Sequence, residues 1–397
     1  MRPPRPLLLG PLITWALLGP ALGEEPTIQR FGELPGGIGS IAVRVESTPL
    51  AHTAQILPLD SNGNILGAAD ISQQTEAVLE GLDKTLSAAK TSLDRAVKLN
   101  FYVADEGVTS AVEEALRKRF PSSDKPAVSL VETGFATPGV RVAADAVAAT
   151  QLKPEAQLVI GGGDSTRNSP VGVLPVGSHV YVAGQAENGI LEEAVEKTLV
   201  SLKSTLAWLG LDLGRVIQIK TFIGPPSSIP EAERIIRRFF GEETVPPLVF
   251  VEWKSSLPVE IELIAWGGAS SSHEPIEFLT PPGMSESPVF SRVTRVNAPH
   301  IIYVPGLTGP PGESAEIQLR DIFKTLQDAL RQAGSDLRHL AKATYYVSDD
   351  AASSKLNQIR PDYYDPKRPP AASKAMVIGT GRAGRTVTLD MLATSAR

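Results

Sequence analysis

The chain contains no cysteine among its 397 residues. This absence excludes disulfide bonds, thiolate catalysis, cysteine-ligated metal sites and a lipid-anchored N-terminal cysteine. Histidine is scarce as well, and the five histidines show no metal-binding spacing such as H-x-x-x-H. The net charge of −6 leaves no excess of basic residues for a nucleic-acid partner. We therefore expect packed apolar cores to stabilise the protein, and we expect neither a metal centre nor nucleic acid.

Motifs that bind nucleotide cofactors are also lacking. The glycines at 161–163 are followed by Asp164-Ser165, without the lysine that a P-loop requires. Gly379-Thr380-Gly381 lies between two predicted strands, which is typical of a hairpin turn rather than of a dinucleotide fingerprint. No Ser-His-Asp arrangement has a recognisable nucleophile elbow. We expect no cofactor.

Long hydrophobic runs are absent except near the start of the chain. Residues 7–18 are apolar but short for a membrane span and are interrupted by glycine and proline. Arg2 and Arg5 precede this run, and Ala21 and Gly23 place small residues at a cleavage site. The pattern predicts a signal peptide over residues 1–23, and hence a periplasmic or extracellular protein with no membrane span after cleavage. An uncleaved membrane anchor is the alternative.

Residues 199–223 combine a helix pattern with a strand pattern. Leucines recur every three or four residues from 199 to 213, as on one face of an amphipathic helix, and apolar residues alternate from Ile217 onward. The same pattern returns when the sequence is shifted back by 120 residues or forward by 124 residues. Two such matches, each continuing into a strand, predict three copies of one unit.

Each unit is predicted to have the element order β-β-α-β-α-β-β and to belong to the α+β class, with helices on one face of a sheet. In the first unit, strands at residues 40–46 and 51–59 are expected to pair with each other. Glycine-, serine- and proline-rich junctions separate the units. The predicted bounds are residues 37–152 for repeat one, 169–266 for repeat two and 284–397 for repeat three.

Three features recur in every unit. A strand ends in a Gly-Gln-like turn, the long helix runs into a strand of the pattern V-K-T-x-x-F/Y-V-x-D, and the last strand carries an acidic residue. In these features the chain resembles the RidA/YjgF family over nearly all of its length after residue 23. The matching segments are Ala54-Gln55, Gly184-Gln185 and Gly306-Leu307; residues 97–105, 217–225 and 341–349; and Ala144-Asp145-Ala146, Ile261-Glu262-Leu263 and Leu389-Asp390-Met391.

The resemblance implies a chorismate-mutase-like fold, an assembly and an activity. Family members are commonly homotrimers with ligand sites in the clefts between subunits. Three fused copies therefore suggest a monomeric, single-chain pseudo-trimer, since linkage raises the effective concentration of each unit. The alternative is three separate units that each trimerise with other chains. The family's deaminases hydrolyse enamine or imine intermediates to 2-oxo acids and ammonia.

The resemblance also implies site residues. The family's deaminases hold the substrate carboxylate with an arginine, a bidentate contact that lysine cannot reproduce. All three units lack this arginine, and the matching positions are Val128, Leu248 and Ala372. Asp145, Glu262 and Asp390 match the carboxyl group that positions or activates water, and they are the predicted catalytic residues. Asn357 and Phe290 match further ligand-binding positions. Replacement cations could come from Arg141, Lys374, Arg382 or Arg385.

Three functions remain open at this stage. The leading hypothesis is an exported protein that binds small carboxylate- or imine-type molecules between its repeats. The second is an active imine or enamine deaminase with a rebuilt carboxylate grip. The third is a non-catalytic scaffold for protein interaction, which apolar clefts filled by Val128, Leu248 and Ala372 would favour.

Overall fold

The computed structural model describes residues 27–156, 158–161, 171–241, 245–270 and 272–396. The predicted signal peptide and most of the glycine-rich junction at 161–163 lie outside these ranges. Among the described helices, none has both the length and the apolar character of a membrane span.

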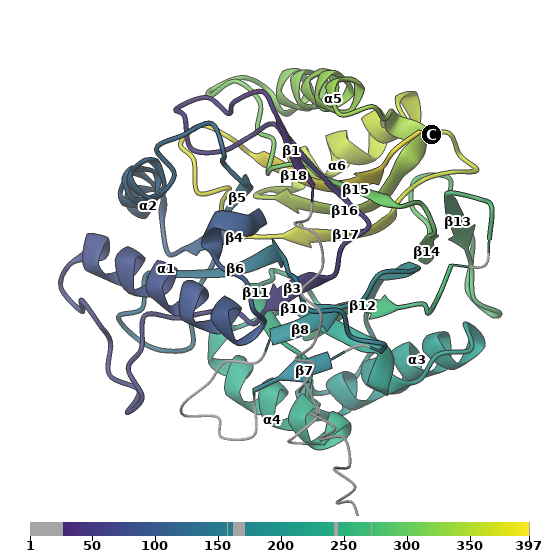
Figure 1. Cartoon of the computed structure of the whole chain (residues 1–397), viewed down its shortest axis with the longest axis horizontal. Coiled ribbons are helices and arrows are strands. Elements are labelled where there is room, and N and C mark those ends of the chain that lie inside the picture. The colour runs from purple at the N-terminus through teal and green to yellow at the C-terminus, as the bar shows by residue number, and fades with distance from the viewer. Residues whose placement is uncertain (1–26, 157, 162–170, 242–244, 271, 397) are drawn as a thin grey trace, which may run out of the picture.

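The first sheet is built mainly from repeat one. Its six strands follow the order β5-β4-β6-β3-β8-β7, and only β4 and β5 run parallel. Helices α1 (Ile71–Ala88) and α2 (Glu106–Arg119) cover its outer face (Figure 1). The strands are β3 (Leu50–Thr53), β4 (Ala96–Val103), β5 (Ala127–Glu132), β6 (Val142–Ala149), β7 (Leu158–Ile160) and β8 (Val171–Leu174).

The second sheet repeats this topology with the order β11-β10-β12-β9-β14-β13. Helices α3 (Leu191–Trp208) and α4 (Ile229–Phe240) cover it on the outside. The strands are β9 (His179–Gln185), β10 (Val216–Ile223), β11 (Leu248–Glu252), β12 (Val259–Trp266), β13 (Ile276–Leu279) and β14 (Val293–Val296).

The third sheet contains both ends of the described chain, in the order β1-β2-β15-β18-β16-β17. Helices α5 (Ala315–Gln332) and α6 (Asp350–Ile359) lie on its outer face. Its strands are β1 (Ile28–Phe31), β2 (Ala42–Glu46), β15 (His300–Tyr303), β16 (Leu340–Val347), β17 (Ala371–Met376) and β18 (Val387–Thr394). Three similar sheets with covering helices confirm the predicted α+β class.

The predicted leucine stripe forms the buried face of the long helix in each repeat. Leu199, Leu202 and Leu206 of α3 are buried against the second sheet. The stripe was expected to reach residue 213, but α3 ends at Trp208 because Gly210 turns the chain at a φ of 74°. Lys90 and Gly334 adopt the same left-handed conformation at the matching positions. A short 3-10 helix (Leu93–Arg95, Leu213–Arg215 or Leu337–His339) then leads into the central strand of each repeat.

Strand partners are exchanged between the repeats. The predicted pairing of residues 40–46 with 51–59 is wrong: β2 pairs with β15 of the third sheet, and β3 pairs with β8. In the same way, β14 pairs with β9 of the second sheet. Alternating apolar residues predict a strand but do not identify its partner. Each sheet thus includes strands from another part of the chain. In the third sheet, these are β1 and β2 from the start of the chain, which pair next to β15.

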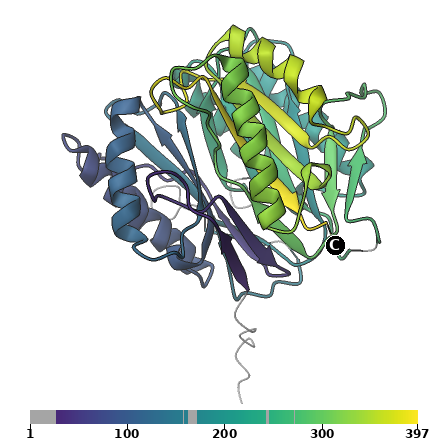
Figure 2. The same cartoon turned by 90° about the horizontal axis from the view of Figure 1, so that it is seen from above.

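The inner faces of the three sheets pack together around a common centre, and the helices lie outside (Figures 1 and 2). Val97, Ile217 and Ala341, at matching positions in the three repeats, belong to one buried cluster at this centre. Each sheet also has its own apolar core beneath its helices. The centre therefore consists of residues from all three repeats.

Contacts between repeats occur where the edge strand of one sheet meets the Gly-Gln-like turn of another, and each such contact is called a joint below. At the repeat 1–2 joint, Gln55 N–H donates to the Leu248 carbonyl at 2.9 Å. At the repeat 1–3 joint, Gly306 N–H donates to the Val128 carbonyl at 3.2 Å. At the repeat 2–3 joint, Gly184 N–H donates to Ser373 Oγ at 3.0 Å. The motifs that carried the family resemblance thus meet across repeat boundaries.

Candidate functional site

A ring of polar side chains lies on the inner faces of the sheets. Each central strand (β4, β10 and β16) has a bulge at its start, at the same place in all three repeats. Because side chains alternate beyond the bulge, two positions per strand point toward the common centre. The first position holds Lys98, Gln218 and Lys342, and the second holds Asn100, Lys220 and Thr344.

Asp390, a predicted catalytic residue, lies in this ring and is bound by repeat one. Lys98 Nζ lies 2.8 Å from Asp390 Oδ1, and Ser129 Oγ donates to Asp390 Oδ2 at 3.0 Å. Lys98 also donates to the Val304 carbonyl at 2.8 Å. Burial opposes ionisation of Asp390, but the ammonium groups of Lys98 and Lys220 outweigh it and lower its pKa.

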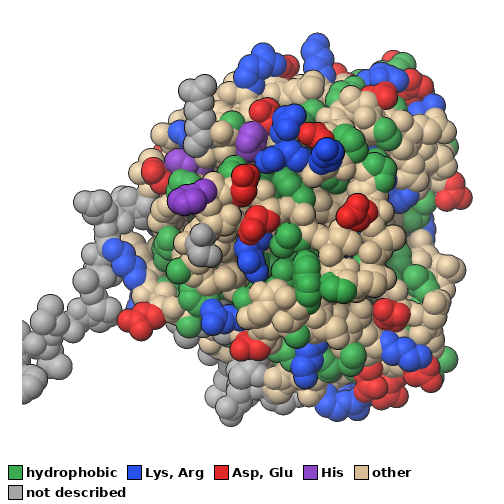
Figure 3. All heavy atoms as spheres, turned by 90° about the vertical axis from the view of Figure 1, so that its right-hand side faces the viewer, with side chains coloured by type: hydrophobic (Ala, Val, Ile, Leu, Met, Phe, Trp, Pro, Cys, Tyr) green, Lys and Arg blue, Asp and Glu red, His purple; other side chains and the backbone are tan. Residues whose placement is uncertain are grey.

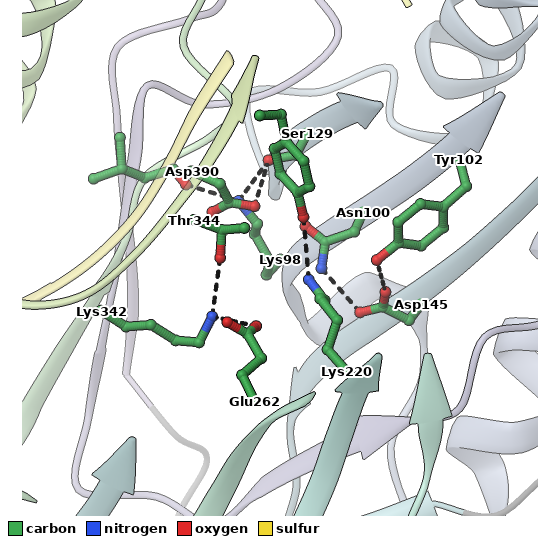
Figure 4. A network of polar contacts seen from close by, with 12 residues as sticks. Lys98, Asn100, Tyr102, Ser129, Asp145, Lys220, Glu262, Lys342, Thr344 and Asp390 are labelled. Carbon is green, nitrogen blue, oxygen red and sulfur yellow. Dashed lines mark hydrogen bonds and ion pairs between the residues drawn. The ribbon is translucent and has the colours of Figure 1, made fainter. Parts of the chain in front are cut away.

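Glu262 makes the equivalent contacts with repeat three. Lys342 Nζ lies 2.6 Å from Glu262 Oε1 (Figure 4). Ser373 Oγ donates to Glu262 Oε2 at 2.6 Å. The Glu262 side chain is only 3% exposed. A carboxylate this deeply buried is stable only with such partners.

Asp145 departs from this pattern. Lysine and serine bind the other two carboxylates, but repeat two has Gln218 and Val249 at these two positions beside Asp145. The Gln218 amide donates to the Thr53 carbonyl and not to Asp145. Asp145 is held within its own repeat by the Asn100 amide at 2.9 Å and the Tyr102 hydroxyl at 2.6 Å. Burial raises its pKa, and the nearby Lys220 ammonium opposes that shift.

The three carboxylates therefore serve as partners in a buried network that connects the repeats. They surround a cavity of about 50 Å³, together with Lys98, Lys220 and Lys342. Their catalytic role stays a prediction, and the geometry gives them a structural one. None of the groups of acidic and histidine side chains in the described ranges has the arrangement of a metal site.

The predicted ligand-binding residues of repeat three gather at the repeat 2–3 joint. Ala372 is half-buried on β17, and Phe290 immediately precedes Ser291, which bridges to the first residue of that strand. Asn357 on α6 accepts hydrogen bonds from Arg360 at 2.6 Å and from Lys374 at 3.3 Å. Its amide oxygen thus positions two cations beside the joint.

Lys374 is the candidate replacement cation on β17, the strand that carries the lost arginine position of repeat three. Residues of β17 alternate between buried and half-buried, so Lys374 lies on the same face as Ala372, two residues further along. Its ammonium group donates to Ser353 Oγ at 2.8 Å. Burial and the Arg360 guanidinium lower the pKa of Lys374, and the carboxyl group of Glu260 opposes that shift.

Glu260 is the acidic residue that sequence reasoning missed. It is half-buried on β12 and packs over Gly184, where an added Cβ would lie 2.0 Å from Glu260 Oε1. Burial, with a further contribution from Glu262, raises the pKa of Glu260 to about 7, against hydrogen bonding from Ser373 and the charge of Lys374. A carboxyl group with this pKa can give or take a proton at neutral pH. The V-E-I-E alternation, which places two glutamates on one face, was the available signal.

The other two joints lack both groups. Strand register places Ala143 and Thr388 where repeat two has Glu260. Leu130 and Phe250 occupy the position of Lys374. Val128 and Leu248, the remaining predicted ligand-binding residues, are buried in the apolar cores of their repeats.

The other candidate replacement cations are engaged elsewhere. Arg141 lies 2.7 Å from Asp105 at the start of α2, and Arg382 lies 2.8 Å from Glu113. Arg385 donates to the Gly309 carbonyl at 3.0 Å. Of the four candidates, Lys374 therefore fits the lost arginine position best, because it lies on the same strand face as Ala372 and within electrostatic range of Glu260.

Comparison with known proteins gives one family. Residues 38–150 match the family model described as endoribonuclease L-PSP. The 3-aminoacrylate deaminase RutC of Acinetobacter baylyi is 28% identical over 99 residues, which cover 25% of this chain and 78% of RutC. A YjgF-family structure from Neisseria meningitidis is 23% identical, covering 32% of this chain and 99% of that one at a TM-score of 0.24. Yeast Mmf1 is 20% identical, with 31% and 99% covered at a TM-score of 0.24.

Proposed function

Because the chain belongs to the RidA/YjgF family, we propose that it binds small carboxylate- or imine-bearing metabolites at the repeat 2–3 joint. The observation that carries this proposal is that Lys374 and Glu260 lie at one joint, whereas the matching positions of the other two joints hold apolar side chains or threonine. Lys374 supplies a point charge for a carboxylate in place of the bidentate arginine. The Asn357 amide oxygen accepts a hydrogen bond from that ammonium group and positions it.

A nucleic-acid substrate is not favoured, although the family model carries an endoribonuclease description. The net charge is −6, and acidic and basic side chains are interspersed on the face shown in Figure 3. Strong binding to RNA backbone needs a concentration of basic residues. A small-molecule ligand fits the composition of the joint better.

The binding proposal is tested by the melting temperature of the chain that begins at Glu24, in the presence of 2-oxobutanoate. We expect the ligand to raise the melting temperature of the wild-type protein and to lose this effect in Lys374→Met. Lys355→Met is the matched control, because Lys355 lies on α6 but pairs with Glu316. Equal stabilisation of Lys374→Met and wild type would contradict the proposal.

Glu260 favours a second function, hydrolysis of the bound imine. Ionised Glu260 would take a proton from water as the water attacks the imine carbon, and the protonated form would then assist departure of ammonia. The net reaction converts an imine and one water to a 2-oxo acid and ammonia. RutC, a deaminase of 3-aminoacrylate, sets the precedent for a related substrate with a carboxylate.

An amino-acid oxidase that generates the 2-imino acid in situ tests this activity. We expect the protein to accelerate 2-oxo acid release, with a pH profile that inflects near the pKa of Glu260, and we expect Glu260→Gln to abolish the acceleration. Glu252→Gln serves as control, because Glu252 on β11 accepts a hydrogen bond from the Gly134 N–H of repeat one. If no acceleration occurs but 2-oxobutanoate still binds, the protein is a binding protein; if neither occurs, a scaffold role is favoured.

We also infer export and a monomeric state. The N-terminal sequence supports export, and the closed exchange of strands supports a chain in which three repeats take the place of three subunits.

A further inference from the structure

Lys374 lies beside a second cation at the repeat 2–3 joint, the guanidinium group of Arg360. Arg360 is buried, its Cζ atom lies 5.0 Å from the centre of the Tyr345 ring, and it donates to Asn357 Oδ1 at 2.6 Å. The Lys374 ammonium group donates to the same oxygen atom at 3.3 Å. The two cationic nitrogen atoms are therefore no more than about 6 Å apart, a range at which like charges repel each other.

The hydrogen-bond partners of Lys374 do not neutralise its charge. Its ammonium group donates to Ser353 Oγ at 2.8 Å and to the Asn357 amide oxygen, and both partners are uncharged. The carboxyl group of Glu260 attracts it only from a longer range. Burial and the Arg360 guanidinium lower the pKa of Lys374 against this attraction. Each fall of one pKa unit gives about tenfold more of the neutral amine near pH 7.

A neutral amine is a nucleophile, whereas an ammonium ion is not. Lysines that are desolvated or lie next to another cation form Schiff bases with carbonyl substrates. Lys374 meets both conditions and is accessible to a ligand, since its side chain is half-buried and its contact with Asn357 is exposed. Arginine stays charged near neutral pH. Arg360 therefore keeps a positive charge at the joint even when Lys374 is neutral.

We propose that the Lys374 amine forms a Schiff base with the carbonyl carbon of a 2-oxo acid bound at the repeat 2–3 joint. This inference rests on the proposed function, because it takes the same class of ligand at the same joint. In its ammonium form Lys374 attracts the carboxylate of the ligand. After it has given a proton to ionised Glu260, its nitrogen attacks the C2 atom.

Glu260 balances the protons of this reaction. A bond forms between the lysine nitrogen and C2, and the carbonyl oxygen becomes a hydroxyl group by taking a proton from that nitrogen. Protonated Glu260 then returns its proton to the hydroxyl group, which leaves as water, and a protonated C=N bond remains. A carboxyl group with a pKa of about 7 can accept and return a proton near neutral pH.

Reduction with sodium cyanoborohydride tests the proposal, because this reagent converts the C=N bond to a stable secondary amine and spares the 2-oxo acid. With 2-oxobutanoate at pH 7, the intact mass of the chain that begins at Glu24 should increase by the mass of the acid less one oxygen atom. Peptide mapping should place this adduct on Lys374. Lys355→Met, the control on α6 whose lysine pairs with Glu316, should give the same adduct.

Two further variants separate the nucleophile from the charge. Lys374→Arg keeps a cation without a nucleophilic amine, so 2-oxobutanoate should still raise its melting temperature while the adduct is lost. Arg360→Met removes the neighbouring charge and should lower the rate of labelling at pH 7 about tenfold, with half-maximal labelling at a higher pH. Arg360→Lys, which keeps the charge, should retain most of the wild-type rate.

The outcomes distinguish this inference from the binding proposal. If 2-oxobutanoate raises the melting temperature of the wild-type protein but no adduct forms on Lys374, the inference is overturned and the binding proposal stands. If neither stabilisation nor an adduct is observed, both are overturned. An equal amount of adduct in Lys374→Arg would place the reaction on other lysines and would also overturn the inference.

Discussion

Two glutamates on the same face of β12 have different surroundings. Glu262 is paired with Lys342 and Ser373, whereas Glu260 packs over Gly184 and is influenced by Lys374 only at longer range. The spacing V-E-I-E predicts that both side chains share a face. It does not reveal which of them meets a lysine from another repeat, because that lysine is 80 residues away in the chain.

The raised pKa of Glu260 predicts a pH-dependent stability. Its pKa is about 7 in the folded protein and 4.5 in the unfolded chain, so the folded state binds more protons between these values. The free energy of unfolding should therefore fall as pH rises from 4.5 to 7. Glu260→Gln should remove this decrease in the free energy of unfolding. At pH 7.5 the variant should therefore be more stable than wild type by up to about 3 kcal/mol. Denaturant unfolding at pH 4.5 and pH 7.5 measures the difference; identical pH dependence in both proteins would contradict it.

The buried histidines predict the opposite dependence in acid. Burial lowers the pKa of His52 to about 3 and that of His179 to about 4, below the unfolded value of 6.5. The unfolded chain binds more protons below pH 6.5, so stability should fall as pH drops from 6.5 toward 4, by about 1.4 kcal/mol per unit of pKa shift. His52→Tyr, which introduces the residue found at this position in β9 and β15, should reduce the loss. Urea unfolding of both proteins at pH 4.5 and 7 tests this, and an unchanged acid sensitivity would argue against it.

The network at the centre should be sensitive to loss of one partner. Lys342→Met removes the ammonium group that is paired with buried Glu262, with Lys220 interacting only at longer range, and should destabilise the protein by about 3–5 kcal/mol. Adding Glu262→Gln to Lys342→Met should restore part of that stability, because the uncompensated charge is gone. Thermal unfolding of the two variants and of Lys355→Met as control gives the comparison. A double variant no more stable than Lys342→Met would show that the charge is not the cause.

At the scale of elements, the helices were predictable from local pattern and the sheet partners were not. The leucine stripe predicts α1, α3 and α5 because burial of one helix face needs only a 3.6-residue period. The pairing of β2 with β15 joins residues about 255 positions apart, and no local feature encodes it. For the same reason, the gathering of Lys374 and Glu260 at one joint could be recognised only in the fold.

The β1–β2 pair should stabilise the third sheet, because it joins the start of the chain to β15. Val43 and Val45 of β2 are buried, and β2 covers the edge of β15. A chain that begins at Ser47 should lose on the order of 3–6 kcal/mol from these two valines alone. The exposed edge of β15 should also promote self-association. Thermal unfolding and size-exclusion chromatography, with a chain that begins at Thr27 as control, test this; equal melting temperatures and elution volumes would contradict it.

At the scale of the whole molecule, one chain contains the three sheets that surround a common centre. Each joint lies between two repeats of the same chain, and β1–β2 completes the exchange of strands. We therefore expect the chain that begins at Glu24 to be a monomer in multi-angle light scattering. A stable trimer of chains would contradict this expectation and would support separate trimerisation of each repeat.

Fusion of the repeats allows each joint to diverge independently. The repeat 2–3 joint has Glu260 and Lys374, while the other two have apolar side chains or threonine at those positions. We therefore expect one ligand site of this kind per chain.

Isothermal titration calorimetry with 2-oxobutanoate measures how many ligand sites each chain has. We expect a stoichiometry of one ligand per chain for the wild-type protein and for Lys355→Met, and no measurable binding to Lys374→Met. A stoichiometry of three, or a Lys374→Met protein that binds with unchanged affinity, would contradict the account.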